Sequence, residues 1–270
     1  AGTHTLKWES FYTGTYAAYV RNLEVKNTEE SAVKILDRYS VPISGDSLKY
    51  TFSGLKPNTT YYVRSYVQVQ DCDTVYSSLT SFTTKPITVK ADSTMNIGQV
   101  SATLNGTVDY GDATVVAEGI QYRKTEPAET EEWSSVTATA EGEKLTANIN
   151  GLSPNSVYAW RTFVEAQDGN TVYSSVLSFS TPAFFENTGV SSITQTSAGL
   201  SAKLVPTNED DVTYYFKNTN GTVVEGTTDE STLSGNLTGL TPNTSYTYYA
   251  VAKTSDGKEY ASSAIMFKTT

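Results

Sequence analysis

The stretch Gly151-Leu152-Ser153-Pro154-Asn155-Ser156-Val157-Tyr158 occurs in three versions in this chain, and it decides the fold. The other copies span residues 54–61 and 239–246, so the stretch recurs after 97 and then 88 residues. Each copy is predicted to end one strand, turn through Pro-Asn and begin the next strand at its tyrosine. We call this element the corner. Its spacing indicates three repeated units of about 90 residues.

The unit boundaries are predicted from two proline-containing junctions, at residues 84–87 and 181–184. They divide the chain into a divergent first unit (1–85), a second unit (86–182) and a third unit (183–270). The junctions are short, and a proline stiffens each through its fixed φ. We therefore expect a semi-rigid, extended rod, since flexible tethers are usually long and rich in Gly and Ser.

The composition favours strands. The chain has 19 Tyr, and runs of aromatic and β-branched residues are bounded by Gly, Asn, Asp and Pro. Ala102, Leu104 and Val108 alternate on one predicted face of the second unit, and Ala198 and Leu200 begin the same pattern in the third. The first unit is less regular, with a polar loop expected at 27–30. Its strands are predicted at residues 5–10, 14–20, 32–39, 49–53, 61–69 and 75–83.

The charge balance restricts the partners. The chain carries 19 Lys and Arg against 29 Asp and Glu, a net charge of −10. Nucleic acid and anionic membrane surfaces are therefore disfavoured, because both are polyanions. No apolar run approaches the roughly 20 residues that span a bilayer, so we expect no membrane insertion by this segment.

The single Cys rules out a disulfide framework within the chain. The chain begins at Ala1 rather than Met, which indicates a processed or trimmed chain. We expect an exported protein, extracellular or at the cell surface, with lipid anchoring through a removed N-terminus as one option. The oligomeric state is open, with a monomer favoured.

Together the corner and the terminal strands resemble fibronectin type III domains, all-β sandwiches of the immunoglobulin-like kind. The tyrosine matches the tyrosine corner of such domains, whose ring enters the core while its hydroxyl bonds nearby backbone. The resemblance covers nearly the whole chain in three copies. The residues that carry it are Leu55, Pro57, Tyr61, Leu152, Pro154, Tyr158, Leu240, Pro242, Tyr246 and the terminal strands from Tyr76, Tyr173 and Tyr260.

The variant resembles modular bacterial surface proteins and surface lipoproteins, whose members act as spacers, adhesins or glycan-capture components. Two departures stand out. Leu104 and Leu200 occupy the second-strand position where the family often has Trp, and the first unit lacks the Ala-x-Leu pattern.

The sequence contains few groups suited to catalysis, so we expect neither enzymatic activity nor a cofactor. His4 is the only histidine, and no nucleophile–base or nucleotide-binding motif is present. The acidic clusters 71–73 and 209–211 could offer oxygen ligands to Ca²⁺, but neither has EF-hand spacing, and we favour solvated turns. Cys72 lies at a predicted hairpin tip, where it either forms an intermolecular disulfide or is an incidental surface residue.

Exposed aromatic residues are the best indication of binding. If Tyr61 faces the core, alternation turns the neighbouring side chains at 62, 64 and 66 outward, along with Arg161. Trp133, in the acidic segment 125–133, is either a sugar platform or a lid packed on the sheet edge. The candidate partner surface is Trp133, Tyr62, Arg64, Tyr66, Phe163 and Tyr249. Ordinary cross-strand pairing on a solvated face is the competing explanation.

These observations predict a non-catalytic extracellular modular protein for cell-surface adhesion or protein interaction. Its partner would be a protein or a glycan at a cell surface. The alternatives are a carbohydrate-binding surface protein in glycan capture, or an accessory region of a larger secreted enzyme.

Overall fold

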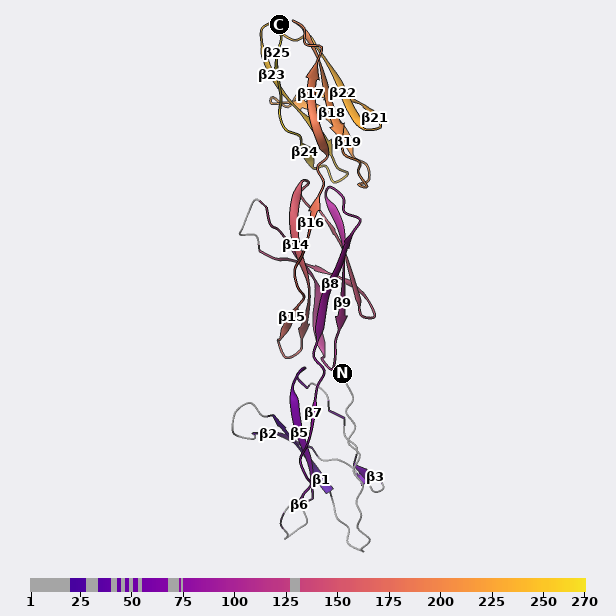
Figure 1. The fold of residues 1–270 in the computed structure, drawn as a ribbon, viewed down its shortest axis with the longest axis vertical. Coiled ribbons are helices and arrows are strands. Elements are labelled where there is room, and N and C mark those ends of the chain that lie inside the picture. Colours follow the sequence, from indigo (N-terminus) through magenta and orange to yellow (C-terminus); the bar gives the residue numbers. More distant parts are fainter. Residues whose placement is uncertain are drawn as a thin grey trace.

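A computed structural model describes residues 20–27, 34–39, 43–44, 47–48, 51–52, 55–67, 73, 75–126 and 132–270. Figure 1 shows three strand-rich units stacked end to end in one long rod. Within these residues every regular element is a β-strand. The predicted class, tandem β-sandwiches of the fibronectin type III kind in an extended rod, is confirmed.

The second unit contains two antiparallel sheets. One has the order β12-β13-β9-β8, and the other has the order β11-β10-β14-β15 with β16 also pairing with β14. The chain crosses between the sheets where β11 is followed directly by β12. The strands are β8 (Thr88–Met95), β9 (Ser101–Asp109), β10 (Val115–Lys124), β11 (Ser134–Thr137), β12 (Thr139–Glu141), β13 (Lys144–Asn150), β14 (Ser156–Ala166), β15 (Thr171–Tyr173) and β16 (Leu177–Thr181).

The third unit repeats this plan. Its sheets have the orders β17-β18-β22-β21 and β20-β19-β23-β24, with β25 pairing with β23. The strands are β17 (Phe185–Ser191), β18 (Ser197–Leu204), β19 (Thr213–Asn218), β20 (Val223–Glu225), β21 (Thr227–Asp229), β22 (Thr232–Thr238), β23 (Ser245–Lys253), β24 (Glu259–Ala261) and β25 (Ile265–Lys268).

In the first unit the described strands form one five-stranded sheet and one hairpin. The sheet has the order β2-β1-β5-β6, with β7 also pairing with β5, and the hairpin is formed by β3 and β4. The strands are β1 (Val20–Asn27), β2 (Lys34–Tyr39), β3 (Ile43–Ser44), β4 (Ser47–Leu48), β5 (Thr60–Val67), β6 (Val75–Tyr76) and β7 (Thr80–Thr83).

The sequence-based strands of the first unit are right only in part. The predictions at 32–39 and 61–69 correspond to β2 and β5, while 75–83 is divided into β6 and β7. The prediction missed β1, which pairs with both β2 and β5 and is specified by these two neighbours rather than by a clear local pattern. Thr51 and Phe52 are not in a strand. The prediction at 5–10 lies outside the described residues, and the prediction at 14–20 overlaps them only at Val20, the first residue of β1.

The predicted alternation forms the cores. Trp160 has no exposed surface and packs in the second unit with Leu104, Ile120 and Ile149, so its structural assignment is confirmed. Leu104 therefore fills the position where the family often has Trp. The matching core of the third unit contains Ala198, Leu200, Ala202, Leu204, Phe216, Leu233 and Ala250.

The tyrosine corner is present in all three units. The hydroxyls of Tyr61, Tyr158 and Tyr246 accept hydrogen bonds from the backbone N–H groups of Lys56, Ser153 and Thr241, at 2.9, 2.8 and 2.8 Å. Each ring also stacks on a phenylalanine of the last strand, at centroid distances of 5.6–5.8 Å. The corner thus joins the turn to the core through one side chain.

A buried threonine completes each corner, and the sequence analysis did not identify it. In the second unit the Thr181 hydroxyl donates to the Ser153 carbonyl at 2.7 Å and accepts from the Ser156 N–H at 3.1 Å. Thr84 and Thr269 make the same two bonds in the other units. All three are buried, and their spacing in the sequence equals that of the corners. We call this arrangement the threonine clasp.

The junction between the first and second units is built from ordered backbone. The Lys85 N–H donates to the Asp112 carboxylate at 2.8 Å. Gly111 has φ +55°, and a Cβ there would lie 2.3 Å from the Pro86 carbonyl oxygen, so the loop requires glycine. A cleft of about 220 Å³ is lined by the first corner (55–57) and by residues 114 and 166–168 of the second unit.

The junction between the second and third units contains side-chain bonds in both directions. Gln99 is fully buried, donates to the Pro206 carbonyl at 3.0 Å and accepts from the Thr207 hydroxyl at 2.8 Å. Glu209 accepts from the Val100 N–H at 3.0 Å and the Ser101 hydroxyl at 2.8 Å. These bonds support the predicted stiffness of the rod.

The threonine clasp can be tested with Thr181→Val, which preserves side-chain shape but removes the hydroxyl. The Ser156 N–H and Ser153 carbonyl would then lose a partner, so we expect the second unit to lose about 1–3 kcal/mol of unfolding free energy. Urea unfolding followed by tryptophan fluorescence measures this change, because Trp133 and Trp160 both lie in this unit. Thr181→Ser keeps the hydroxyl and serves as the control. Equal losses in the two variants would contradict the clasp.

Candidate binding surface

The outer face of the β11-β10-β14-β15 sheet carries the candidate binding side chains of the second unit. Along β14 the residues alternate between the core and this face, with Trp160, Thr162 and Val164 buried. Arg161 and Phe163 lie between them and are half-buried, as the alternation predicts. Phe163 packs on Tyr173 of β15 at 6.5 Å between ring centroids.

Two arginines and two aromatic rings form a continuous row on this face. The Arg161 guanidinium carbon lies 4.3 Å from the Trp133 ring centroid and 3.8 Å from that of Tyr173. The guanidinium carbon of Arg123 lies 4.9 Å from the Trp133 centroid. We call Arg123, Trp133, Arg161 and Tyr173 the arginine ladder. Cation–π attraction of this kind orders side chains that are otherwise flexible.

Gln121 fixes the central arginine of the ladder. Its side-chain oxygen accepts from Arg161 Nε at 3.0 Å and from Nη2 at 2.8 Å, and the two residues are direct cross-strand partners. These bonds use two of the five N–H donors of the guanidinium, so it retains donors for a ligand. A positive charge with little rotational freedom is suited to recognising an anionic group.

The position of Trp133 fits a lid packed on the sheet edge better than a free platform for a sugar. Ser134 pairs with Tyr122 at the edge of the sheet. Because the strands are antiparallel, Trp133, the residue before Ser134, lies beside Arg123, the residue after Tyr122. The ring is half-buried and lies against both ladder arginines. Residues 127–131 of the acidic segment lie outside the described residues.

The first unit has a shorter version of this surface. Arg64 lies with its guanidinium carbon 3.8 Å from the centroid of Tyr76, and Tyr62 is half-buried. Tyr66 corrects the prediction of an exposed row, because it is only 3% exposed and packs on Tyr76 at 5.7 Å between ring centroids. Alternation gives the direction of a side chain, but neighbouring side chains decide its exposure.

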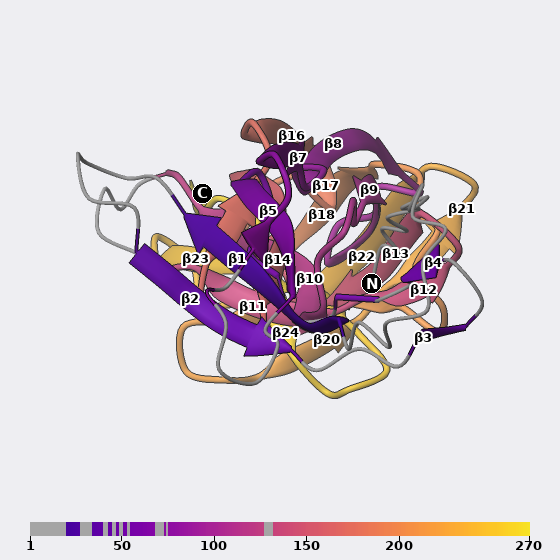
Figure 2. The ribbon, with the colours of Figure 1, turned by 90° about the horizontal axis from the view of Figure 1, so that it is seen from below.

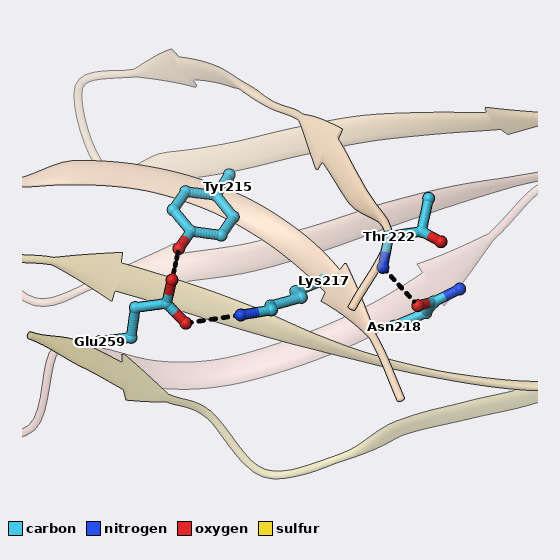
Figure 3. Close-up of polar contacts among 5 residues, drawn as sticks. All are labelled: Tyr215, Lys217, Asn218, Thr222 and Glu259. Atoms are coloured by element: carbon cyan, nitrogen blue, oxygen red, sulfur yellow. Dashed lines mark hydrogen bonds and ion pairs between the residues drawn. The ribbon is translucent and has the colours of Figure 1, made fainter. Parts of the chain in front are cut away.

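In the third unit the same face carries a paired charge network instead of a ladder. Tyr249 is half-buried and pairs across the sheet with Lys217. Figure 3 shows Glu259 accepting from the Tyr215 hydroxyl at 2.6 Å and from Lys217 Nζ at 2.7 Å. Asn218 accepts from the Thr222 N–H at the adjoining turn, at 2.8 Å.

The charge network changes the acidity of its members. The hydrogen bonds from Lys217 and then from Tyr215 lower the pKa of Glu259. Loss of hydration, followed by the hydrogen bond to Glu259, raises the pKa of Tyr215 to about 12. The lowered pKa keeps the Glu259 carboxylate ionised at neutral pH, and this carboxylate pairs with Lys217 Nζ at 2.7 Å.

The sequence does not mark several residues of these surfaces as binding candidates. Tyr173 and Tyr76 carry only the terminal-strand motif, and no sequence motif includes Arg123 or Gln121. One signal was available, because Arg64 and Tyr76 recur as Arg161 and Tyr173 at the repeat spacing of 97 residues. The lateral contacts themselves depend on the cross-strand register, which the sequence does not specify.

Among the described residues no three His, Cys, Asp or Glu side chains are grouped so as to hold a metal ion. Glu209, one of the acidic cluster, bonds to the second unit instead. Cys72 lies outside the described residues. In the part of the chain that the structure describes, no helix is long and apolar enough to cross a membrane.

Comparisons with known proteins give partial matches. No protein-family model matches the chain. Receptor-type tyrosine-protein phosphatase eta of Gallus gallus is 24% identical over 269 residues, covering 98% of this chain and 18% of the relative. The chain thus spans less than a fifth of the length of that curated relative.

Two solved structures are similar to this chain. The FN1–FN3 domains of chicken CNTN1 are 14% identical, covering 94% of this chain and 90% of that chain, with a TM-score of 0.27. A two-domain fibronectin type III segment of chicken tenascin is 15% identical, covering 67% and 99%, with a TM-score of 0.29. Because these TM-scores are low, the fold assignment rests on the strand order and on the tyrosine corners and not on the superpositions.

The ladder can be tested with Arg161→Ala, made in a Trp8→Phe background. Removing the guanidinium leaves Trp133 and Tyr173 without their shared cation, which costs about 0.5–1 kcal/mol per ring at an exposed site. We expect this loss in urea unfolding, together with stronger acrylamide quenching of Trp133, since Trp160 is shielded in the core.

Arg161→Lys is the matched control for the ladder test. It retains the charge without the planar group, so we expect an intermediate effect on quenching. Unchanged quenching in Arg161→Ala would show that the arginine does not cover Trp133.

Proposed function

We propose that this chain is a non-catalytic interaction segment of an extracellular or cell-surface protein, in which the arginine ladder of the second unit contacts a protein partner. The observation that carries the proposal is the position of Arg161 between two aromatic rings on the outer face of the sheet. Aromatic residues and arginine are the side chains that contribute most strongly to protein–protein contacts. The stiff junctions suit a segment that presents this face at a distance from an attachment point.

The setting of this function is part of the same proposal. The tandem sandwich architecture and the partial match to a receptor-type protein both support a place at the cell surface. A bacterial surface protein or lipoprotein is the setting that the sequence resemblance implies.

Glycan capture is the second candidate function. Tyr173 is 43% exposed, and aromatic rings of this kind can stack on sugars. The arginine ladder favours the protein partner, because the Trp133 ring already lies against two guanidinium groups. A role as accessory region of a larger secreted enzyme is compatible with the same surface.

The proposal is tested by screening the intact chain against arrays of secreted and cell-surface proteins and against a glycan array. We expect binding to at least one protein, and at least a tenfold loss of affinity in Arg161→Ala, as is usual for a contact in the centre of an interface. Lys203→Ala in the third unit removes an equal charge and should bind like the parent. Binding to glycans alone, or protein binding that does not depend on Arg161, would overturn the proposal.

A further inference from the structure

A cleft of about 800 Å³ lies at the start of β10, where the chain crosses from β11 to β12. Its apolar walls include Val115, Val116 and Ala138, and Glu118 also lines it. Val116 lies at the register shift between Val115 and Ala117, and its side chain is 57% exposed. An irregularity of this kind changes the direction of a side chain, so here it adds an apolar wall to the cleft.

The cleft contains a carboxylate that the protein does not fully satisfy. Glu118 is half-buried, and its Oε2 atom is buried without a hydrogen-bond partner. Loss of hydration, followed by a hydrogen bond with Glu118, raises the pKa of Tyr110 to about 12, so this hydroxyl stays protonated at neutral pH. Rotation about the last side-chain bond of Glu118 can turn Oε2 toward the cleft, because such torsions have broad preferences. A cationic donor in the cleft would relieve the cost of the unsatisfied oxygen.

The fold does not require an acidic side chain at this position. Glu118 pairs across the sheet with Val164, and the matching pair in the third unit is Tyr214 with Ala252, 88 residues beyond Val164. The Tyr214 ring packs edge-on against Phe185, at 6.1 Å between centroids, on the core of the third unit. An aromatic ring thus packs on the core there, where the second unit has a carboxylate in a cleft.

The start of β10 is also an open edge of its sheet. β11 pairs with β10 only from Gly119 to Tyr122, so the first four residues of β10 have β14 as their one partner among the described strands. The chain then enters β12 in the other sheet, which lies apart from β11 when the rod is viewed along its axis (Figure 2). The backbone groups of this edge can therefore pair with an extended segment of another protein.

We propose that this cleft binds a lysine side chain of a protein partner, with the ammonium at the Glu118 carboxylate and the segment that carries it along the open edge of β10. The apolar walls suit the hydrocarbon stem of lysine, whose ammonium is a compact charge. Arginine fits less well, because its paired N–H groups bind both oxygens of a carboxylate, and Tyr110 already engages this one.

The electrostatics of the whole chain support a cationic partner. The net charge is −10, which attracts a basic segment over long range. The site lies at the opposite end of β10 from Arg123, so it is separate from the arginine ladder. This inference therefore goes beyond the proposed function and does not depend on it.

The test titrates the intact chain at low salt with the peptide acetyl-Gly-Gly-Lys-Gly-Gly-amide and follows the backbone amide signals by NMR. We expect saturable shifts at the amides of residues 115–118 and 138. The same peptide with norleucine keeps the stem and lacks the charge, so we expect it to bind about tenfold more weakly. The peptide with arginine should also bind more weakly than the lysine peptide.

Two variants and one small amine complete the test. Glu118→Gln keeps the shape of the side chain and removes its charge, so the lysine peptide should bind it about tenfold more weakly. Glu225→Gln, at an exposed position of the third unit, is the matched control and should bind like the parent. n-Butylamine reproduces the lysine side chain without a backbone, so it should bind more weakly than the peptide.

Each contrary outcome has a distinct meaning. Equal binding of the lysine and norleucine peptides would identify an apolar site and overturn the inference. Lysine binding that survives Glu118→Gln, or shifts that lie elsewhere, would also overturn it. So would n-butylamine binding as tight as that of the peptide, which indicates a site for free amines, and tighter binding of the arginine peptide. None of these measurements involves Arg161, so the protein arrays decide the proposed function separately.

Discussion

The structure depends on one repeated constraint, the attachment of a turn to the core by the hydroxyl of a tyrosine whose ring packs against that core. In the second unit Tyr158 satisfies the Ser153 N–H, and Thr181 satisfies the carbonyl of the same residue. A turn that enters a core would otherwise leave these backbone groups without partners, at a cost comparable to a lost hydrogen bond for each. The corner also ties the start of β14 to the end of β16, so both strands are positioned by one small cluster.

Because the corner and core positions specify the sandwich, the alternate positions on the outer face are free to differ. The second unit places Arg161 between Trp133 and Tyr173 there, whereas the third unit pairs Glu259 with Lys217 and Tyr215. The outer face of the second unit presents the Arg161 guanidinium, whereas in the third unit the Lys217 ammonium is paired with the Glu259 carboxylate. This contrast between units of one architecture is the strongest reason to regard the ladder as functional.

The corner also has a second role, between the units. Residues of the first corner line a cleft with the hairpin of the second unit, and a Cβ at Gly151 in the second corner would lie 3.6 Å from Lys258 Nζ of the third. The same turn that closes one sandwich therefore lies beside the hairpin of the next. Short proline-containing junctions and the buried Gln99 reinforce this arrangement. A stiff rod keeps faces on successive units in a constant relation, which a flexible chain would not.

The amino-acid sequence by itself determined the all-β class, the three repeats, the tyrosine corners and the inward alternation of residues such as Leu104 and Trp160, because these follow from local patterns with fixed periods. It also indicated that Arg161 and Phe163 face outward. Only the tertiary structure decided which outward side chains meet, since contacts such as Arg161 with Tyr173 join strands whose register depends on the whole sheet. It likewise buried Tyr66, formed β1 between two neighbouring strands and engaged Glu209 at a junction, because burial and pairing depend on neighbours distant in the chain.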